Sequence, residues 1–254
     1  MKKSPALFYK SISVVLVTVI LVGFVWISLV RINHRLDFST LWAYKYRLWQ
    51  GFKMTLIMAF ASLLVSLLLG SVAAMAQKSR FLVLSYLAKI YIQIIRGTPL
   101  LVQIFFFFYI IGTAWGVDNR YLAGVLILSL FEGAYIAEII RGGLESIDES
   151  QFELAKAVGL TPAKTFRLVT FPLLMARILP ALTGQFASII KDSSLLSVIA
   201  IPELTQITQE ISADNYRLFE NYFFLGLLYF VMTFAVSLIT RHLERMYKHE
   251  NSAG

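Results

Sequence analysis

A series of apolar runs restricts the fold of this chain more than any other feature, because several reach the roughly 20 residues that a helix needs to span a bilayer. The runs occupy residues 12–30, 51–76, 99–111, 121–140, 179–201 and 222–240. Inside lipid, every backbone N–H and C=O group needs a partner within the protein, so only helices and closed barrels can span it. Because the runs are uniformly apolar rather than alternating, they predict an all-α, polytopic membrane protein.

Polar breaks between the runs predict how the chain is organised. We expect an N-terminal transmembrane helix with an external connector at 1–50, a membrane core at 51–243 and a cytoplasmic tail at 244–254. The run at 12–30 is longer than a signal-peptide core and has no small-residue cleavage site after it, so we expect a retained membrane helix. Arg96-Gly97-Thr98-Pro99 splits a longer apolar stretch, which predicts an interfacial helix over 81–95 before the span 99–111.

The longest polar interruption covers residues 149–172, inside a predicted cytoplasmic loop over 144–177. Ser150 and Glu153 have the spacing of a capping box, in which each side chain accepts a hydrogen bond from a free backbone N–H group of the first turn. This spacing predicts a short helix that ends near Val158.

Gly159 suits the left-handed position just after a helix end, and Thr161 with Pro162 can cap and begin a second helix. The sequence therefore predicts two short helices folded about Gly159. The hairpin also has apolar side chains of its own, which favour docking to another protein: Phe152, Leu154, Ala155, Val158 and Leu160.

Basic residues predict the orientation in the membrane, because cytoplasmic flanks are enriched in Lys and Arg. With an inside N-terminus, the predicted inner segments, which include Lys2, Lys3 and Lys10, carry roughly twice as many Lys and Arg residues as the outer segments. This count places both termini and the hairpin in the cytoplasm. The first outer connector disagrees, because it holds most of the outer charge: Arg31, Arg35, Lys45, Arg47 and Lys53. The net charge of +8 is explained by these membrane flanks and does not indicate nucleic-acid binding.

Charged side chains within membrane segments are costly and mark paired or functional positions. Glu138 can reach Arg141 one turn away, so an ion pair is favoured over a contact with substrate. Glu132 lies deeper without a local partner, and it either pairs with Lys191 or another buried group or holds a cationic group of a substrate. Lys191 and Asp192 interrupt the run at 179–201, where they either line a translocation path or mark a helix break.

No catalytic or metal site is predicted. The chain has no cysteine, no GxxxxGK[ST] phosphate loop and no Ser-His-Asp arrangement, and its histidines lack metal-ligand spacing.

Four blocks carry a resemblance to a known family: GFKMTL at 51–56, RGTPLLVQ at 96–103, AYIAEIIRGG at 134–143 and ELAKAVG at 153–159. With Pro172, KDSSL at 191–195 and Glu203-Leu204, they resemble the permease subunits of ATP-binding-cassette importers, in the polar amino-acid branch. Two positions depart from the pattern: Leu154 replaces an alanine of the family's EAA loop, and Ser193 replaces a threonine.

The resemblance implies a type I importer permease core of five helices, here with one extra N-terminal helix, in the cytoplasmic membrane. It implies an ATPase-coupling role for the loop residues Glu153, Ala155, Ala157, Gly159, Leu160 and Pro172. The expected partners are a separate ATPase that uses ATP and Mg²⁺, a second permease (identical or homologous), an external solute-binding protein and an amino-acid substrate. This chain itself is expected to bind no cofactor and to be no enzyme. An ion-coupled secondary transporter or channel is the alternative, but it would have no use for an ATPase-docking loop.

Overall fold

The computed structural model describes residues 5–31 and 36–252, and these residues are helical without a strand. The predicted all-α fold class is confirmed. Lys2, Lys3 and Arg35, which entered the charge count, lie outside the described residues. The chain divides into two compact units, Met1–Trp42 and Ala43–Gly254.

The first unit contains α1 (Pro5–Arg31) and most of α2 (Ser39–Ala43). The segment Ile12–Ser28 of α1 is apolar. Three of its hydroxyl groups bond inside the helix: those of Ser13, Thr18 and Ser28 each donate to the carbonyl oxygen four residues earlier. Such bonds let a polar side chain lie in an apolar surrounding without an unpaired donor.

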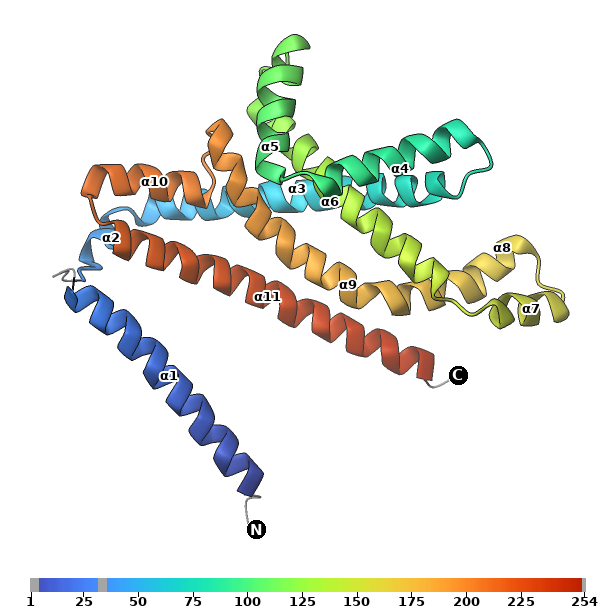
Figure 1. The fold of residues 1–254 in the computed structure, drawn as a ribbon, viewed down its shortest axis with the longest axis horizontal. Helices are drawn as coiled ribbons and strands as arrows, with labels where there is room; N and C mark the ends of the chain where they lie inside the picture. Colours follow the sequence, from blue (N-terminus) through green and yellow to red (C-terminus); the bar gives the residue numbers. More distant parts are fainter. Residues whose placement is uncertain (1–4, 32–35, 253–254) are drawn as a thin grey trace. The chain divides into compact units, whose positions relative to one another are not determined.

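The second unit holds the remaining helices (Figure 1). They are α3 (Lys45–Gln77), α4 (Leu82–Gly97), α5 (Leu100–Phe105), the π-helical η1 (Phe106–Gly112), α6 (Arg120–Glu145), α7 (Glu149–Ala157), α8 (Pro162–Thr165), the π-helical η2 (Phe166–Thr170), α9 (Phe171–Asp192), the 3₁₀-helical η3 (Ser193–Ile199), α10 (Leu204–Asn215) and α11 (Leu218–Ser252).

Four helical stretches of the described residues are long and apolar enough to cross a membrane: Lys45–Gln77, Arg120–Glu145, Pro162–Ile199 and Leu218–Thr240. Together, α4 and α5–η1 pass the same test, but they are bent by 113° at their junction, as a broken span or a re-entrant loop would be. Each predicted core span overlaps one of these stretches, and the described residues hold four spans, or up to five if the bent pair is one span.

Two predicted boundaries are wrong. The first core helix begins at Lys45, not at residue 51, because the aromatic and basic residues of the connector already adopt the helix. The fifth begins far before residue 179, because α8, η2, α9 and η3 form one continuous helix of 38 residues. Pro172 has no N–H group to donate, but it does not end this helix, because the π turn of η2 just before it already changes the local hydrogen-bond pattern.

Small residues let α3 and α6 approach closely, as is usual where helices pack in lipid. A Cβ atom at Gly70 would lie 2.6 Å from the Ile136 Cγ2 atom and 2.9 Å from the carbonyl oxygen of Gly133. Ser129, which is buried in the same contact, donates to the Val125 carbonyl oxygen at 2.6 Å and to that of Ser62 at 3.2 Å. Helices α3 and α6 form the centre of the second unit, and α4 and α9 pack against them.

Within the second unit, α10 lies at the opposite end from α7 and α8 (Figure 1). It is tied to the first turns of α3, where Tyr44 donates to the Asp214 carboxylate at 2.5 Å and Arg47 pairs with Glu210. The pairing of Arg47 offers a reason for the unusual charge of the first outer connector, since part of that charge is used inside the fold.

Candidate functional site

The turn of the 149–172 hairpin forms as predicted at Gly159, which has a φ of +73°. The N–H group of Leu160 donates to the Ala155 carbonyl oxygen at 3.0 Å, and that of Gly159 donates to the Lys156 carbonyl oxygen at 2.9 Å. These two bonds make a Schellman motif, which satisfies the last carbonyl groups of α7. Thr161 then caps the next helix, accepting from the Lys164 N–H group at 3.4 Å, with Pro162 in its first turn.

The predicted capping box at Ser150 and Glu153 is wrong. Helix α7 begins two residues earlier, with Asp148 rather than Ser150 at the N-cap position, and no side-chain cap bond is formed there. Instead, Asp148 lies 3.8 Å from the Arg177 guanidinium group. The predicted second short helix is the first part of the long α8–η3 helix, so the hairpin is continuous with a span.

The predicted coupling residues divide between the two faces of the hairpin. Ala155 is buried, Leu160 and Pro172 are half-buried, and Glu153, Ala157 and Gly159 are exposed. Next to the exposed positions, Leu154 and Val158 lie one turn apart and expose 60% and 73% of their surface. The hairpin thus presents an apolar pair beside a glycine turn. Whether these residues contact an ATPase stays a prediction.

Apolar packing holds the base of the hairpin against the membrane helices. Ile147 packs in one core cluster with Leu174 and Ile178 of α9, and Phe152 of α7 packs against that cluster. Arg177 also donates to the Ser146 carbonyl oxygen, at the end of α6. The hairpin therefore moves with the ends of α6 and α9 rather than as a free loop.

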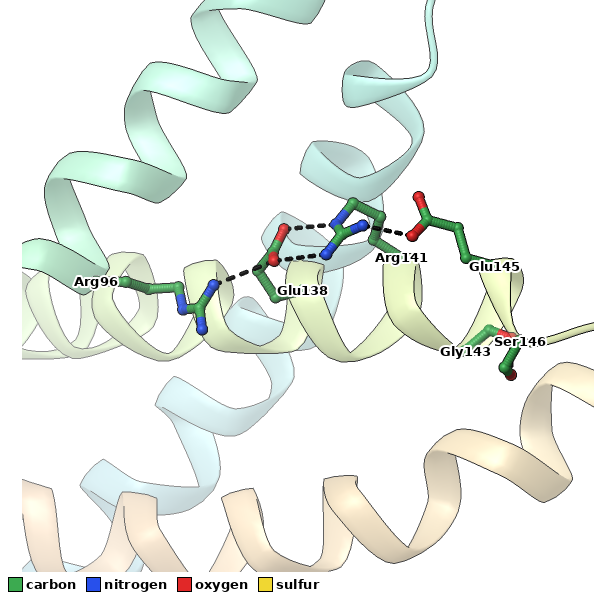
Figure 2. Close-up of polar contacts among 6 residues, drawn as sticks. All are labelled: Arg96, Glu138, Arg141, Gly143, Glu145 and Ser146. Carbon is green, nitrogen blue, oxygen red and sulfur yellow. Dashed lines mark hydrogen bonds and ion pairs between the residues drawn. The ribbon is translucent and has the colours of Figure 1, made fainter.

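Two of the sequence blocks meet at an ion cluster (Figure 2). As predicted, Arg141 pairs with Glu138: Nε donates to Oε1 at 2.9 Å and Nη2 donates to Oε2 at 3.0 Å. The same carboxylate also lies 3.1 Å from Nη1 of Arg96, which comes from α4. Arg141 reaches Glu145 at 2.5 Å with its remaining nitrogen. We call Arg96, Glu138, Arg141 and Glu145 the α6 cluster.

The break between α4 and α5 lies where RGTP predicts it, and a buried glutamine braces it. Gln103 donates through Nε2 to the Ile95 carbonyl oxygen at 2.7 Å and to Oγ1 of Thr98 at 2.8 Å. Thr98 in turn donates to the Ile94 carbonyl oxygen at 2.9 Å. These side chains thereby give hydrogen-bond partners to two carbonyl groups near the end of α4, those of Ile94 and Ile95.

Glu132 is fully buried, as predicted for an interior position. Of the predicted partners, Lys191 is not found, but another group inside the fold is: Gln185 of α9 donates to Oε2, and Oε1 has no hydrogen-bond partner among the described residues. The carboxyl group of Asp192 lies close enough to interact with that of Glu132. Lys191 is exposed, and the helix continues past Asp192 in the 3₁₀ form of η3, so the predicted break is a change of helix type rather than an interruption.

Glu203 is a buried carboxylate whose role sequence reasoning missed. It caps α10 by accepting from the N–H groups of Thr205 at 2.8 Å and Gln206 at 2.7 Å, and it also accepts from the Tyr229 hydroxyl at 2.8 Å. Burial raises the pKa of Glu203 to about 7. A cap residue before an amphipathic helix was the available sequence indication, but the contact with Tyr229 of α11 was not.

These features define a class: an α-helical, multi-pass membrane subunit with an exposed hairpin and no catalytic constellation predicted from its sequence. The comparison with known families is more specific. Residues 66–249 match the family described as binding-protein-dependent transport system inner membrane component, and the chain belongs to this family. It is a permease subunit of an ATP-binding-cassette importer and not an enzyme. The predicted resemblance to the polar amino-acid branch is confirmed.

Relatives are similar over most of their length. The chain is 38% identical to a probable glutamine ABC transporter permease protein of Bacillus subtilis, over 78% of this chain and 92% of that protein. It is 37% identical to a glutamine transport system permease protein of Escherichia coli, over 84% and 98%. Among solved structures, an amino acid ABC transporter with histidines is similar at a TM-score of 0.77 and 35% identity, over 84% and 99%.

Proposed function

We propose that this chain carries a polar amino acid inward across the cytoplasmic membrane, driven by a separate ATPase that docks on the 149–172 hairpin. The names of the relatives support the substrate class, since the two described above are permeases of glutamine transport systems. The chain itself binds no cofactor, and ATP and Mg²⁺ act in the ATPase.

The observation that carries the coupling role is the exposed apolar pair Leu154 and Val158 on a hairpin with a fixed turn. An exposed apolar surface on a rigid element marks a contact with another protein more often than a lone exposed side chain does. Because the hairpin is continuous with the long α8–η3 helix, a displacement of the hairpin also displaces the membrane-spanning part of that helix. An ion-coupled secondary transporter or channel, the alternative function, would not need this element.

The family implies the other partners. A second permease, identical or homologous, completes the translocation path, and an external solute-binding protein delivers the amino acid. The termini and the hairpin lie on the cytoplasmic side, and α10 lies on the external side. The opposite placement of α10 and the hairpin within the second unit supports this arrangement (Figure 1).

The path inside the membrane runs past Glu132, Asp192 and Lys191. Two carboxyl groups from α6 and α9 lie together there without a basic partner for Glu132, which suits the positive group of an amino acid. Glu138 was also a candidate for this path, but its two arginine partners support an ion-pair role instead.

Substitution of Gly159 tests the coupling role. Gly159→Val forces a β-branched residue into a left-handed conformation, at a cost of about 1–2 kcal/mol, and displaces α8 relative to α7. We expect normal membrane insertion, because no span changes, but weaker co-purification of the ATPase and lower substrate-stimulated ATP hydrolysis.

Gly226→Val is the matched control. Gly226 lies in α11 with an ordinary helical backbone, and a Cβ atom added there would meet nothing within 4 Å. Transport and ATP hydrolysis at the parent level in Gly159→Val would show that the hairpin is not the coupling element.

A further inference from the structure

The α6 cluster joins two parts of the fold that are distant in the sequence. Arg96 lies in the last turn of α4, directly before the 113° bend into α5. Glu138, Arg141 and Glu145 follow one another along the last turns of α6, which leads into the hairpin (Figure 2). The contact between Arg96 and Glu138 therefore links the bend to the helix that carries the hairpin.

The bend is rigid enough to transmit a displacement. Gln103 exposes only 5% of its surface and bonds back across the bend to Ile95 and Thr98. Pro99, at the bend, has an extended backbone, which excludes a continuous helix from α4 into α5. A shift of Arg96 is thus a shift of the start of α5.

A second set of polar contacts joins the end of α6 to the base of the hairpin. Ser146 donates to the Gly143 carbonyl oxygen at 2.7 Å and closes the end of α6. Arg177 of α9 donates to the Ser146 carbonyl oxygen and lies 3.8 Å from Asp148, the residue before α7. The backbone of α6 therefore joins two sets of polar contacts, the α6 cluster near the bend and the contacts of Ser146 and Arg177 at the base of the hairpin.

The geometry of Glu138 fixes the orientation of this contact between α4 and α6 as well as its length. Its side chain is 21% exposed, and one carboxylate serves two guanidinium groups, one of them in a two-bond fork. Forked arginine–carboxylate pairs fix orientation as well as distance. The guanidinium group of Arg96 also lies 5.4 Å from the centre of the Tyr135 ring, which keeps it over α6.

We propose that Glu138 is a positioning residue for transport: it locks the α4–α5 bend to the end of α6, so that a displacement of the hairpin moves α5 and η1 with it. The effect of Glu138 on transport rests on the proposed docking of an ATPase on the hairpin. The fixed distance between the hairpin and α5, which is the geometric part of the proposal, does not depend on that docking.

A distance measurement on the full-length permease, assembled with its ATPase, tests the geometric part. The chain has no cysteine, so a permease labelled before assembly carries spin labels only at cysteines introduced at Val102 of α5 and Lys156 of α7, both exposed. We expect one narrow distance distribution for the parent and a broader or shifted one for Glu138→Gln and Arg96→Gln. Arg96→Gln leaves the Glu138–Arg141 pair intact, so it remains informative even if Glu138→Gln does not fold.

Transport per ATP hydrolysed tests the functional part. Coupling between sites commonly changes affinities fivefold or more, so we expect this ratio to fall about fivefold or more in both variants. Because the two residues act through each other, the double variant should be no worse than either single variant. Glu145→Gln is the control: Glu145 is 53% exposed and contacts Arg141 at the far side of the cluster, and it should behave as the parent does.

Parent-like distance distributions in both variants would overturn the proposal, and so would equal changes in Glu145→Gln. If Gly159→Val uncouples transport while Arg96→Gln does not, the positioning role fails and the docking role stands. If the distances change but neither Gly159→Val nor Arg96→Gln alters coupling, the docking role fails and the geometric link stands.

Discussion

At the scale of single residues, polar side chains in this chain serve mainly to satisfy groups that water cannot reach. Tyr91 donates to the Leu130 carbonyl oxygen at 2.6 Å, and Thr240 to that of Val236 at 2.7 Å. Gln103 does the same at a helix break. Because an unpaired backbone group in lipid costs several kcal/mol, such residues stabilise the fold. The Oε1 atoms of Gln103 and Glu132 are both buried without a hydrogen-bond partner, and of these two only that of Glu132 belongs to a carboxyl group.

Glu132→Gln tests whether that oxygen serves the substrate. Glutamine keeps the shape and can still accept a hydrogen bond from Gln185, so the substitution removes the charge alone. A hydrogen bond to a charged group contributes about 1.5–3 kcal/mol, so we expect uptake at limiting substrate to fall about tenfold or more. The assembled complex and its basal ATP hydrolysis should persist, as measured in proteoliposomes.

Glu145→Gln is the control for a carboxylate lost elsewhere on α6. Unchanged uptake in Glu132→Gln, or loss of the assembled complex, would make Glu132 a structural residue. The preference for a cationic or zwitterionic amino acid over an acidic one would then have no support.

At the scale of elements, neighbouring glycines of α6 have different tasks. A Cβ atom at Gly143 would lie 2.2 Å from the Ile178 Cγ2 atom and 2.9 Å from the Leu174 Cδ1 atom, so α9 can approach α6 only over a glycine. A Cβ atom at Gly142 would meet nothing within 4 Å. The sequence block with both glycines therefore contains one residue required by packing and one that packing does not require.

Alanine substitutions separate the two glycines. Gly143→Ala should destabilise the purified permease by about 1–3 kcal/mol, because overpacking forces the helices apart. Gly142→Ala should be neutral or stabilising by up to about 1 kcal/mol, because alanine favours the helix. Thermal unfolding in detergent measures both, and equal midpoints would contradict the close approach of α6 and α9.

At the scale of the whole molecule, the direction of the second unit across the membrane stays a prediction from the basic residues. Helix α10 and the hairpin lie in the second unit, at its opposite ends, with α3, α9 and α11 between them (Figure 1). The charge count assigns the hairpin end to the cytoplasm. Orientation thus rests on the basic residues of many loops, and the spatial separation makes it testable with one label at each end.

Single cysteines at Lys164 and Ala213 test this orientation, since the chain has no cysteine of its own. Both positions are exposed, and Ala213 avoids Asp214, which bonds to Tyr44. In intact cells an impermeant thiol reagent should label position 213 and not position 164, and permeabilisation should make position 164 reactive. Labelling of position 164 in intact cells would reverse the orientation and remove the basis for ATPase docking.

Local features were predictable because their causes lie within a few residues. The length of the apolar runs determined the spans, Pro99 determined the break before α5, and the need for a positive φ placed Gly159 at the turn. The Glu138–Arg141 pair followed from a spacing of one helical turn. Each of these depends on chain geometry that holds before any helix meets another.

Only the tertiary structure decided which distant residues meet, because that depends on how each helix rotates about its axis against its neighbours. It brought Arg96 to Glu138, placed Gln185 rather than Lys191 against Glu132, and joined Glu203 to Tyr229. It also overrode local rules. Packing of Ile147 and Phe152 on α9 replaced the predicted capping box, and the π turn before Pro172 turned a predicted short helix into the start of a span.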